Sequence, residues 1–236
     1  EKLTAYELGL KSILNDGDLV LNLSAFYNDY SDIQAQSFTI LPLPGTAGLM
    51  DYMSTGGDME SKGVEAEIQW LPGSRWNISA NLAWLDAKFN DYEVPAIAGL
   101  GYIEGHSMGD TLSLEGWRPA LSPEWSFTAQ ASYIFDIGKG GTLTPMIQTA
   151  YVGEQYINDL NLAGARQGSY TKTDIRLFWD LPGNKIKMQF YLENIEEEDN
   201  LNSVMVYNPE ERPEIATLLG NWGDLMTYGI LMSYKW

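Results

Sequence analysis

The only histidine, His106, is the side chain in this sequence best suited to acid–base chemistry near neutral pH. It lies in "GYIEGHSMGD", where Ser107 or Ser113 with Asp110 would supply the other members of a Ser-His-Asp arrangement. Neighbours within one loop rarely adopt the geometry of such a triad, so we expect no catalytic residues and no enzyme. One imidazole and no cysteine also argue against a zinc site, and we expect no metal and no cofactor.

Acidic residues dominate the charge of the chain, which is −18 at neutral pH. The run "ENIEEEDN" (193–200) contains four adjacent acids, Glu196 to Asp199. Carboxylates at this density can hold Ca²⁺, but a solvated charge run is the simpler interpretation. The negative balance argues against a nucleic-acid partner, whose phosphates require a basic surface.

The elements that position these side chains are predicted to be strands, because apolar residues alternate with a period of two and helical periodicity is absent. No apolar run approaches the roughly 20 residues of a membrane-spanning helix. About nine strands are expected, at residues 5–14, 19–30, 61–71, 75–89, 123–137, 142–153, 169–181, 185–195 and 226–236.

The predicted connections alternate between short and long. The segments "NDGD" (15–18), "LPGSR" (71–75), "GKGG" (138–141) and "LPGNK" (181–185) are tight turns in which glycine supplies a positive φ. Long segments cover about 31–60, 90–122, 154–168 and 196–224. This order predicts an up-and-down antiparallel meander with all its tight turns at one end. Counted over 31–60, 86–122, 154–168 and 196–224, the long segments hold 20 of the 32 acids and 4 of the 14 bases. They are interpreted as solvated loops or, alternatively, as a negative funnel for a cationic ligand.

Each predicted strand has one apolar and one polar face, as in "WNISANLAW" (76–84). A soluble β-sandwich also alternates in this way, but its strands are usually shorter. Aromatic residues gather at the strand ends and resemble the two interfacial girdles of a membrane barrel. They are Tyr6, Tyr27, Trp70, Trp76, Trp84, Trp125, Phe135, Tyr151, Trp179, Tyr228 and Trp236. The prediction is therefore an all-β fold, an antiparallel up-and-down transmembrane β-barrel segment.

Strand parity predicts that the barrel is larger than this segment. A meander of nine strands starts and ends at opposite membrane faces, whereas single-chain bacterial barrels have an even number of strands. An open sheet would also leave two unpaired edges in lipid. We expect residues 1–236 to be the C-terminal segment of a single β-barrel domain.

Several segments resemble strands of the TonB-dependent outer-membrane receptors. They are "YELGLKSILNDGDLVLNLSAFYNDYSDIQ", "ESKGVEAEIQWLPGSRWNISANLAWLDAKFNDY", "LSPEWSFTAQASYIF" and "TYGILMSYKW". In "YLENIEEEDNLNSV" only Asn194 matches the family's Asn-Leu-Phe-Asp stretch, and Trp236 stands where Phe is commoner.

The resemblance implies a plugged barrel of about 22 strands in the bacterial outer membrane. The plug domain and the segment that contacts TonB would lie upstream, outside this chain. It further implies energised uptake of a bulky scarce substrate such as a ferric siderophore. A passive porin-like channel and a soluble β-sandwich for binding or adhesion remain the alternatives.

If the protein captures a nutrient, the loop ends and the polar wall should carry the contacts. Aromatic and arginine side chains are the usual anchors of such surfaces. The candidates, each of which could equally pack its own loop, are Tyr102, His106, Trp117, Arg118, Tyr156, Arg166, Tyr207, Arg212 and Trp222. The wall charges are expected to pair across the wall or with the plug, and they are Glu65, Glu67, Asp174, Arg176, Lys187 and Glu193.

The last strand resembles the signal that outer-membrane proteins present to the barrel-assembly machinery. Its alternating apolar residues are Tyr228, Ile230, Met232, Tyr234 and Trp236. The expected partners are outer-membrane lipid and lipopolysaccharide, the protein's own plug domain, TonB, the assembly machinery and a small-molecule metal chelate.

Overall fold

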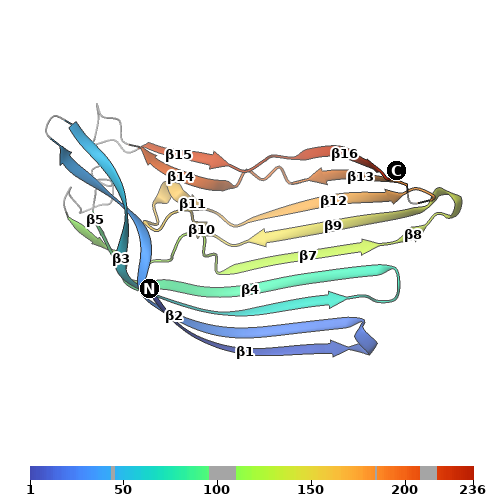
Figure 1. Ribbon diagram of the computed structural model, residues 1–236, viewed down its shortest axis with the longest axis horizontal. Helices are drawn as coiled ribbons and strands as arrows, with labels where there is room; N and C mark the ends of the chain where they lie inside the picture. The colour runs from blue at the N-terminus through green and yellow to red at the C-terminus, as the bar shows by residue number, and fades with distance from the viewer. Residues whose placement is uncertain (44–45, 96–109, 184, 208–216) are drawn as a thin grey trace.

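Nine long strands of the computed structural model lie side by side in one antiparallel sheet (Figure 1). The structure describes residues 1–43, 46–95, 110–183, 185–207 and 217–236, with the backbone alone at 35–43, 46–55, 95, 205–207 and 217–218. The strands are β1 (Lys2–Leu14), β2 (Leu19–Leu43), β3 (Thr46–Trp70), β4 (Trp76–Asp91), β7 (Trp125–Tyr133), β9 (Thr142–Val152), β12 (Tyr170–Asp180), β13 (Ile186–Glu193) and β16 (Thr227–Tyr234).

Each long strand pairs with its neighbour in the order β1-β2-β3-β4-β7-β9-β12-β13-β16, and the short β8 (Phe135–Asp136) also pairs with β9. The predicted up-and-down meander is confirmed. The sandwich alternative is wrong, because the long strands form one continuous sheet instead of two packed ones. In the described part of the chain, no helix has the length and apolar character needed to cross a membrane.

The tight turns all lie at one end of the sheet, together with the C-terminus, and the N-terminus lies toward the other end (Figure 1). They include the 3₁₀ turns η1 (Asn15–Gly17) and η2 (Gly138–Gly140). Gly17 and Gly73 have φ values of 100° and 78°, which favour glycine because a Cβ would be strained there. The predicted role of glycine in these turns is confirmed. We call the two ends of the sheet the turn end and the loop end.

The expectation of a long loop at 31–60 is wrong. Residues of this segment extend β2 and β3, which stay paired up to Leu43 and Thr46, so the hairpin projects beyond the other strands (Figure 1). A register shift between Tyr30 and Ile33 lets the pairing continue past the irregular Asp32, whose φ is 54°. Backbone pairing here overrides the turn-like composition of the segment.

The other long segments also contain short strands and one 3₁₀ turn. The strands are β5 (Glu93–Pro95), β6 (Thr111–Ser113), β10 (Gln155–Tyr156), β11 (Arg166–Gln167), β14 (Leu201–Tyr207) and β15 (Thr217–Trp222), and the turn is η3 (Ala163–Ala165). They pair as β5–β6, β10–β11 and β14–β15, apart from the main sheet. The loop end is therefore built from ordered hairpins at the described positions.

Strand register separates the side chains into an apolar face and a polar face. Leu8, Ala25, Val64, Trp84 and Trp125 lie in one row across five strands of the apolar face. Between this row and the turn end, the described apolar-face positions of the nine strands carry no Asp, Glu, Lys or Arg. Such a band is what a surface in contact with lipid requires.

The polar face carries rows of amides, hydroxyls and charges. One row joins Lys11, Asn22, Glu67, Asn81 and Thr128 across five strands. Because successive residues of a strand point to opposite faces, these rows interleave with the apolar ones. The alternation predicted from the sequence is therefore confirmed across the sheet.

Gly63 provides a close backbone contact on the polar face. Phe26 lies directly opposite Gly63 in the β2–β3 pairing. A Cβ at Gly63 would lie 2.5 Å from the Cζ of Phe26 and 2.6 Å from the carbonyl oxygen of Trp84. The phenyl ring therefore occupies the space that any larger residue would need. This explains the glycine of the "SKGVE" segment.

Asn194 organises the turn that follows β13. Its backbone has a φ of 54°, a left-handed conformation that asparagine tolerates. Its backbone N–H donates to Asp174 Oδ1 at 3.1 Å, and its Nδ2 donates to the carbonyl oxygens of Glu198 and Asp224 at 2.9 Å. Its Oδ1 accepts from the Glu198 backbone N–H at 3.0 Å. The backbone N–H and the buried side-chain amide of Asn194 thus tie β12, the start of the last long segment and the approach to β16 together.

Gly63→Ala is expected to lower the free energy of unfolding of the full-length protein by about 1–3 kcal/mol, because the added methyl meets backbone as well as a ring. Thermal or urea unfolding in detergent measures the change. Gly168→Ala is the matched control, since an added Cβ there has nothing within 4 Å and the φ is not positive. Equal destabilisation by the two substitutions would contradict the packing role of Gly63.

Candidate functional site at the loop end

A buried cluster covers the polar face at the loop end. Tyr30, Met59 and Phe89 form one polar-face row on β2, β3 and β4. Around Phe89, the loop cluster comprises the buried Ile33, Phe89, Tyr92, Leu112 and Leu114, with Tyr30, Met59, Val94, Trp117 and Leu160 packed against it. Residues 92–94 and 112–117, which the structure describes in the segment after β4, therefore fold inward over the polar face.

Backbone hydrogen bonds fix this inward path. The Phe89 N–H donates to the Trp117 carbonyl at 2.9 Å, and the Leu114 N–H donates to the Tyr92 carbonyl at 2.8 Å. A Cβ at Gly57 would lie 2.5 Å from the ring of Tyr92, so glycine is needed where the ring crosses β3. Leu114 is fully buried. The loop cluster is a small core of its own.

The segment that follows β6 is joined to the segment that follows β9. The Leu121 N–H donates to the Tyr156 carbonyl at 2.9 Å, and the Ala120 N–H donates to Asp159 Oδ1 at 2.6 Å. Leu160, from the second segment, packs against the loop cluster. The two segments are therefore held together by backbone hydrogen bonds and packing.

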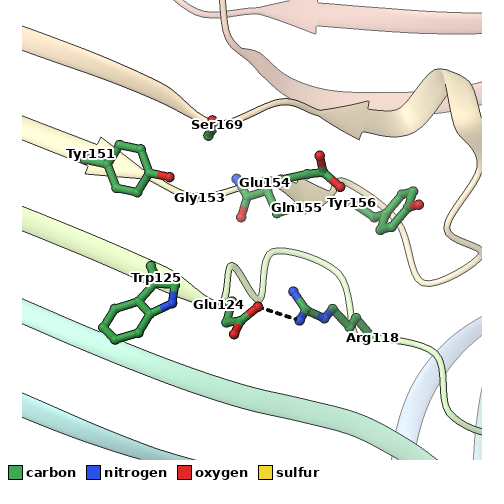
Figure 2. A pocket seen from close by; sticks show the side chains of 9 residues that line it. All are labelled: Arg118, Glu124, Trp125, Tyr151, Gly153, Glu154, Gln155, Tyr156 and Ser169. Carbon is green, nitrogen blue, oxygen red and sulfur yellow. Dashed lines mark hydrogen bonds and ion pairs between the residues drawn. The ribbon is translucent and has the colours of Figure 1, made fainter.

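A hollow of about 430 Å³ lies between these segments and the ends of β7 and β9 (Figure 2). We call it the rim hollow. Its lining residues are Arg118, Glu124, Trp125, Tyr151, Gly153, Glu154, Gln155, Tyr156 and Ser169. Trp125 and Tyr151 belong to the apolar face by register, so the rim hollow lies on that side of the wall.

Ion pairs border the rim hollow. The Arg118 guanidinium pairs with Glu124 at 3.1 Å (Figure 2), and the Trp84 indole N–H donates to the same carboxylate at 3.4 Å. Arg166 pairs with Glu154 on the neighbouring hairpin. The hydrogen bond from Arg166 lowers the pKa of Glu154. The carboxylate is half-exposed, so solvent screens this pair and its contribution to stability is small.

The Glu196 side chain is hydrogen-bonded to the backbone of β12 near the loop end of the sheet. Its Oε2 accepts from the Thr173 backbone N–H at 2.7 Å. Burial raises the pKa of Glu196, but the hydrogen bonds from Thr173 outweigh it and lower the pKa. One member of the acidic run is thus an anchor for the last long segment.

The charges of the polar face pair with one another along the wall. Arg176 bridges Asp174 at 3.3 Å and Glu193 at 2.6 Å, and Lys187 pairs with Asp180 at 2.8 Å. The predicted pairing across the wall is confirmed for these residues. The carboxylates of the first strands also have wall partners: Glu67 accepts from Asn22 at 2.9 Å and Glu65 from Ser24 at 3.5 Å.

A second hollow, of about 350 Å³, lies on the polar face toward the turn end. Phe178 and Leu231 give it an apolar part, and the Asp180–Lys187 pair borders it. Leu231 is 60% exposed at a polar-face position of β16. The exposed Leu231 and the partly buried Phe178 lie on the polar face, where the sequence predicts contact with a plug.

The nine predicted contact residues do not form one site. Arg118 and Tyr156 meet at the rim hollow, with the Glu154–Arg166 pair beside it. Trp117 packs against the loop cluster instead. Trp222 is 57% exposed on β15, opposite Leu201.

The other candidates have no described side chain. Tyr207 ends β14, where the structure describes the backbone alone, and Tyr102, His106 and Arg212 lie outside the described residues. Contact with a substrate stays a prediction for all nine. The sequence does not predict that Glu124, Trp125 and Tyr151 line a hollow, although Trp125 and Tyr151 are among the aromatic residues expected at strand ends.

The final strand pairs with β13 from Thr227 to Tyr234. The Tyr234 and Trp236 rings meet edge to face, with their centroids 5.2 Å apart. The apolar side chains of β16 are exposed, Tyr228 at 78%. Their role as an assembly signal stays a prediction.

Comparison with known proteins bears on all of this geometry. Residues 1–195 match the family model described as TonB dependent receptor-like, beta-barrel. The pesticin receptor of Yersinia enterocolitica is 25% identical over 197 residues, which cover 83% of this chain and 24% of that protein. The chain thus spans about a quarter of the length of the curated relatives it matches.

Solved structures share the fold. The ferric yersiniabactin uptake receptor FyuA from Yersinia pestis superposes with a TM-score of 0.72 at 20% identity, over 98% of this chain and 29% of that one. The siderophore receptor PiuA from Acinetobacter baumannii gives a TM-score of 0.66 at 15% identity, over 98% and 28%.

These relatives are receptors of the outer membrane and not enzymes, which confirms the predictions of location and of no enzyme activity. The apolar face is accordingly the one that meets lipid, and the polar face lines the barrel lumen. The family model covers most of the chain, and the nine-strand sheet has the meander order expected of a barrel wall. The chain therefore belongs to the TonB-dependent receptor family, as part of its outer-membrane β-barrel.

Proposed function

We propose that this chain is the C-terminal part of the barrel wall of a receptor that takes up a ferric siderophore. The complete barrel would have about 22 strands. A plug domain and a TonB-contacting segment encoded upstream would fill the lumen and couple uptake to energy. The substrate would be a small-molecule metal chelate.

The observation that carries the proposal is the pairing of the lumenal charges within the wall. An ion-selective pore presents rings of charged side chains to the passing ion. Here Arg176 is neutralised by Asp174 and Glu193, and Lys187 by Asp180. A wall with its charges neutralised in this way suits a protein-filled lumen better than a passive channel.

The hollow around Phe178 and Leu231 supports the same conclusion. The exposed Leu231 would face water in an open pore, which is unfavourable for an apolar side chain, whereas a plug domain would cover it. The Asp180–Lys187 pair beside the hollow would offer hydrogen bonds to the same partner.

The relatives support the substrate class. The proteins of similar fold include receptors for ferric yersiniabactin, ferric catecholates and ferric preacinetobactin. We propose substrate contacts at the loop end from Tyr102, His106, Tyr207, Arg212 and Trp222. Aromatic and arginine side chains there suit the flat, oxygen-rich surface of a metal chelate.

Assembly is proposed to depend on β16. An alternating strand that ends on an exposed aromatic residue can be recognised by edge pairing with an assembly factor. Tyr228, Ile230, Met232 and Tyr234 lie on its apolar face, the exposed Trp236 follows two residues beyond its end, and the five side chains would supply that recognition.

The full-length gene product should restore growth on a ferric siderophore to an iron-limited strain that lacks its own receptors, and only when TonB is present. Uptake of radiolabelled ferric siderophore by intact cells, tested over a panel of chelates, measures this directly. The control is the same strain with tonB deleted.

Two outcomes would contradict the function. Uptake that persists without TonB, together with open conductance in planar bilayers, would favour the passive channel. Failure of every ferric chelate, with TonB-dependent uptake of another nutrient, would keep the transporter and overturn the substrate class.

Trp236→Ala should reduce the amount of receptor at the cell surface several-fold, since it removes the aromatic residue that follows β16 while leaving the β13–β16 pairing in place. Surface labelling and immunoblotting of outer-membrane fractions measure the change. Trp222→Ala, an exposed tryptophan at the loop end, is the control for loss of an aromatic residue. Normal surface levels of the Trp236 variant would contradict the assembly role.

A further inference from the structure

One part of the lumenal wall carries only uncharged side chains, most of them short. β4 and β7 lie side by side near the middle of the sheet (Figure 1), and four successive pairs of their side chains face the lumen. We call these eight positions the β4–β7 strip. They are Asn77 with Ser132, Ser79 with Gln130, Asn81 with Thr128, and Ala83 with Ser126. The strip therefore consists of amides, hydroxyls and one methyl group.

The β4–β7 strip runs along the wall from the turn end toward the loop end. On β4 it begins beside Trp76 and ends beside Trp84, two of the aromatic residues expected at strand ends. The six residue steps from Asn77 to Ala83 rise about 20 Å along the strand. The strip is therefore a continuous uncharged path over most of the lipid-facing band.

Carboxylates border the strip on the β3 side but are drawn away from it. Glu67 lies opposite Asn81 of the strip. Its carboxylate accepts from Asn22 at 2.9 Å, and Asn22 belongs to β2, on the far side of β3. One row further toward the loop end, Glu65 accepts in the same way from Ser24 of β2 at 3.5 Å. Both carboxylates are therefore directed away from β4.

Charge is also held back on the other side of the strip. The lumenal residues of β9 that lie opposite β7 are uncharged, from Met146 to Val152. Charge begins on β12, where Arg176 pairs with Asp174 at 3.3 Å and with Glu193 of β13 at 2.6 Å. The shorter of these contacts draws the guanidinium toward β13. The strip thus lies between two groups of charges whose partners are on the side away from it.

The polar side chains of the β4–β7 strip have no partner in the part of the wall that the structure describes. None of the seven makes a hydrogen bond or an ion pair with a described residue. Hydroxyl and amide groups can both donate and accept hydrogen bonds. These groups are therefore available to a partner inside the lumen.

We propose that the β4–β7 strip is the track along which a ferric chelate moves past the plug, an inference that rests on the proposed function. Passage requires contacts that are many and weak, because a strong contact would retain the moving molecule. Hydrogen bonds to uncharged groups are weaker than those to charged groups. The chelate would exchange hydrogen bonds with successive rows of the strip on its way to the turn end.

Side-chain size favours a moving occupant at this part of the wall. Serine, threonine and alanine are shorter than the Arg176, Phe178 and Tyr191 side chains that face the lumen on β12 and β13. The wall therefore fills less of the lumen along the strip than along those strands. The ion pairs of β12 and β13 suit a stationary plug. A plug that also rests permanently on the strip is the alternative, which makes it an outcome of the test.

The experiment compares two threonines of the polar face, Thr128 on the strip and Thr227 on β16, opposite Glu193. In the full-length receptor, Thr128→Trp should lower the TonB-dependent uptake rate of a radiolabelled ferric chelate about tenfold or more, because the indole would obstruct the track. Binding of the chelate to cells without TonB should change by no more than about twofold, since the loop end is unaltered. Thr227→Trp is the matched control and should change neither quantity by more than about twofold.

Uptake rates are divided by the amount of receptor at the cell surface, so a variant that assembles less well is still compared correctly. Equal uptake by the two variants, with normal uptake by the unaltered receptor, would overturn the track alone. So would a loss of chelate binding as large as the loss of uptake, since position 128 would then act on capture. An unaltered receptor that takes up no ferric chelate would overturn the proposed function itself.

A second measurement avoids a bulky substitution. This chain contains no cysteine, so Thr128→Cys and Thr227→Cys each introduce one thiol into it with little change in side-chain size. During energised uptake, a ferric chelate with a thiol-reactive arm should label the first variant about tenfold or more faster than the second. Labelling of both at equal rates would overturn the track. Labelling of neither would also overturn it, because the strip would then hold only the plug.

Discussion

Hydrogen bonding of the backbone in a layer without water is the constraint on which this structure depends. Each N–H and carbonyl group of a membrane strand must pair with a neighbouring strand, because lipid offers no partner. The meander meets this requirement along its interior strands, from β2 to β13, through in-register antiparallel ladders. The two outer edges, on β1 and β16, are where a closed barrel would place its remaining pairing.

Side-chain alternation then follows from the strands themselves. One face must avoid charge within the hydrocarbon, and the other is free to carry it. The lumenal face carries ion pairs such as Lys187–Asp180. On the lipid-facing side, charged residues such as Lys62 and Asp86 begin only beyond Trp84, toward the loop end. The same sheet therefore has one surface for lipid and one for a plug and substrate. Whether a residue occupies an odd or an even position along its strand decides which surface it joins.

The loop end adds a second level of organisation. Phe89 and Leu114 form a core of their own on the lumenal side, and this core holds Tyr92 and Leu112 inward. The joined segments around Leu121 and Tyr156 leave Arg118 on the outer side, above the aromatic row. One end of the wall thus presents ordered surfaces both to the lumen and to the outer leaflet.

Much of the fold could be predicted from the sequence because strand period, glycine turns and aromatic ends are local signals. In "WNISANLAW" the alternation of apolar and polar residues alone predicts which side chains share a face of the strand. The extended β2–β3 hairpin could not be predicted, since its pairing overrides a composition typical of loops. The rim hollow and the orientation of Arg118 depend on contacts between segments that are distant in sequence, such as Leu121 with Tyr156, and no local pattern encodes them.

The most direct test of the two-faced wall compares adjacent positions of β9. Ile147 lies on the apolar face and is 48% exposed, and Gln148 lies on the polar face opposite Gln130 and Asp174. This chain contains no cysteine, so a spin label can be attached at Ile147→Cys or Gln148→Cys of the full-length receptor in membranes. Collision with lipid-soluble oxygen should be high at position 147 and low at position 148. Equal collision rates at the two positions would contradict a single-layer barrel wall with one face in lipid.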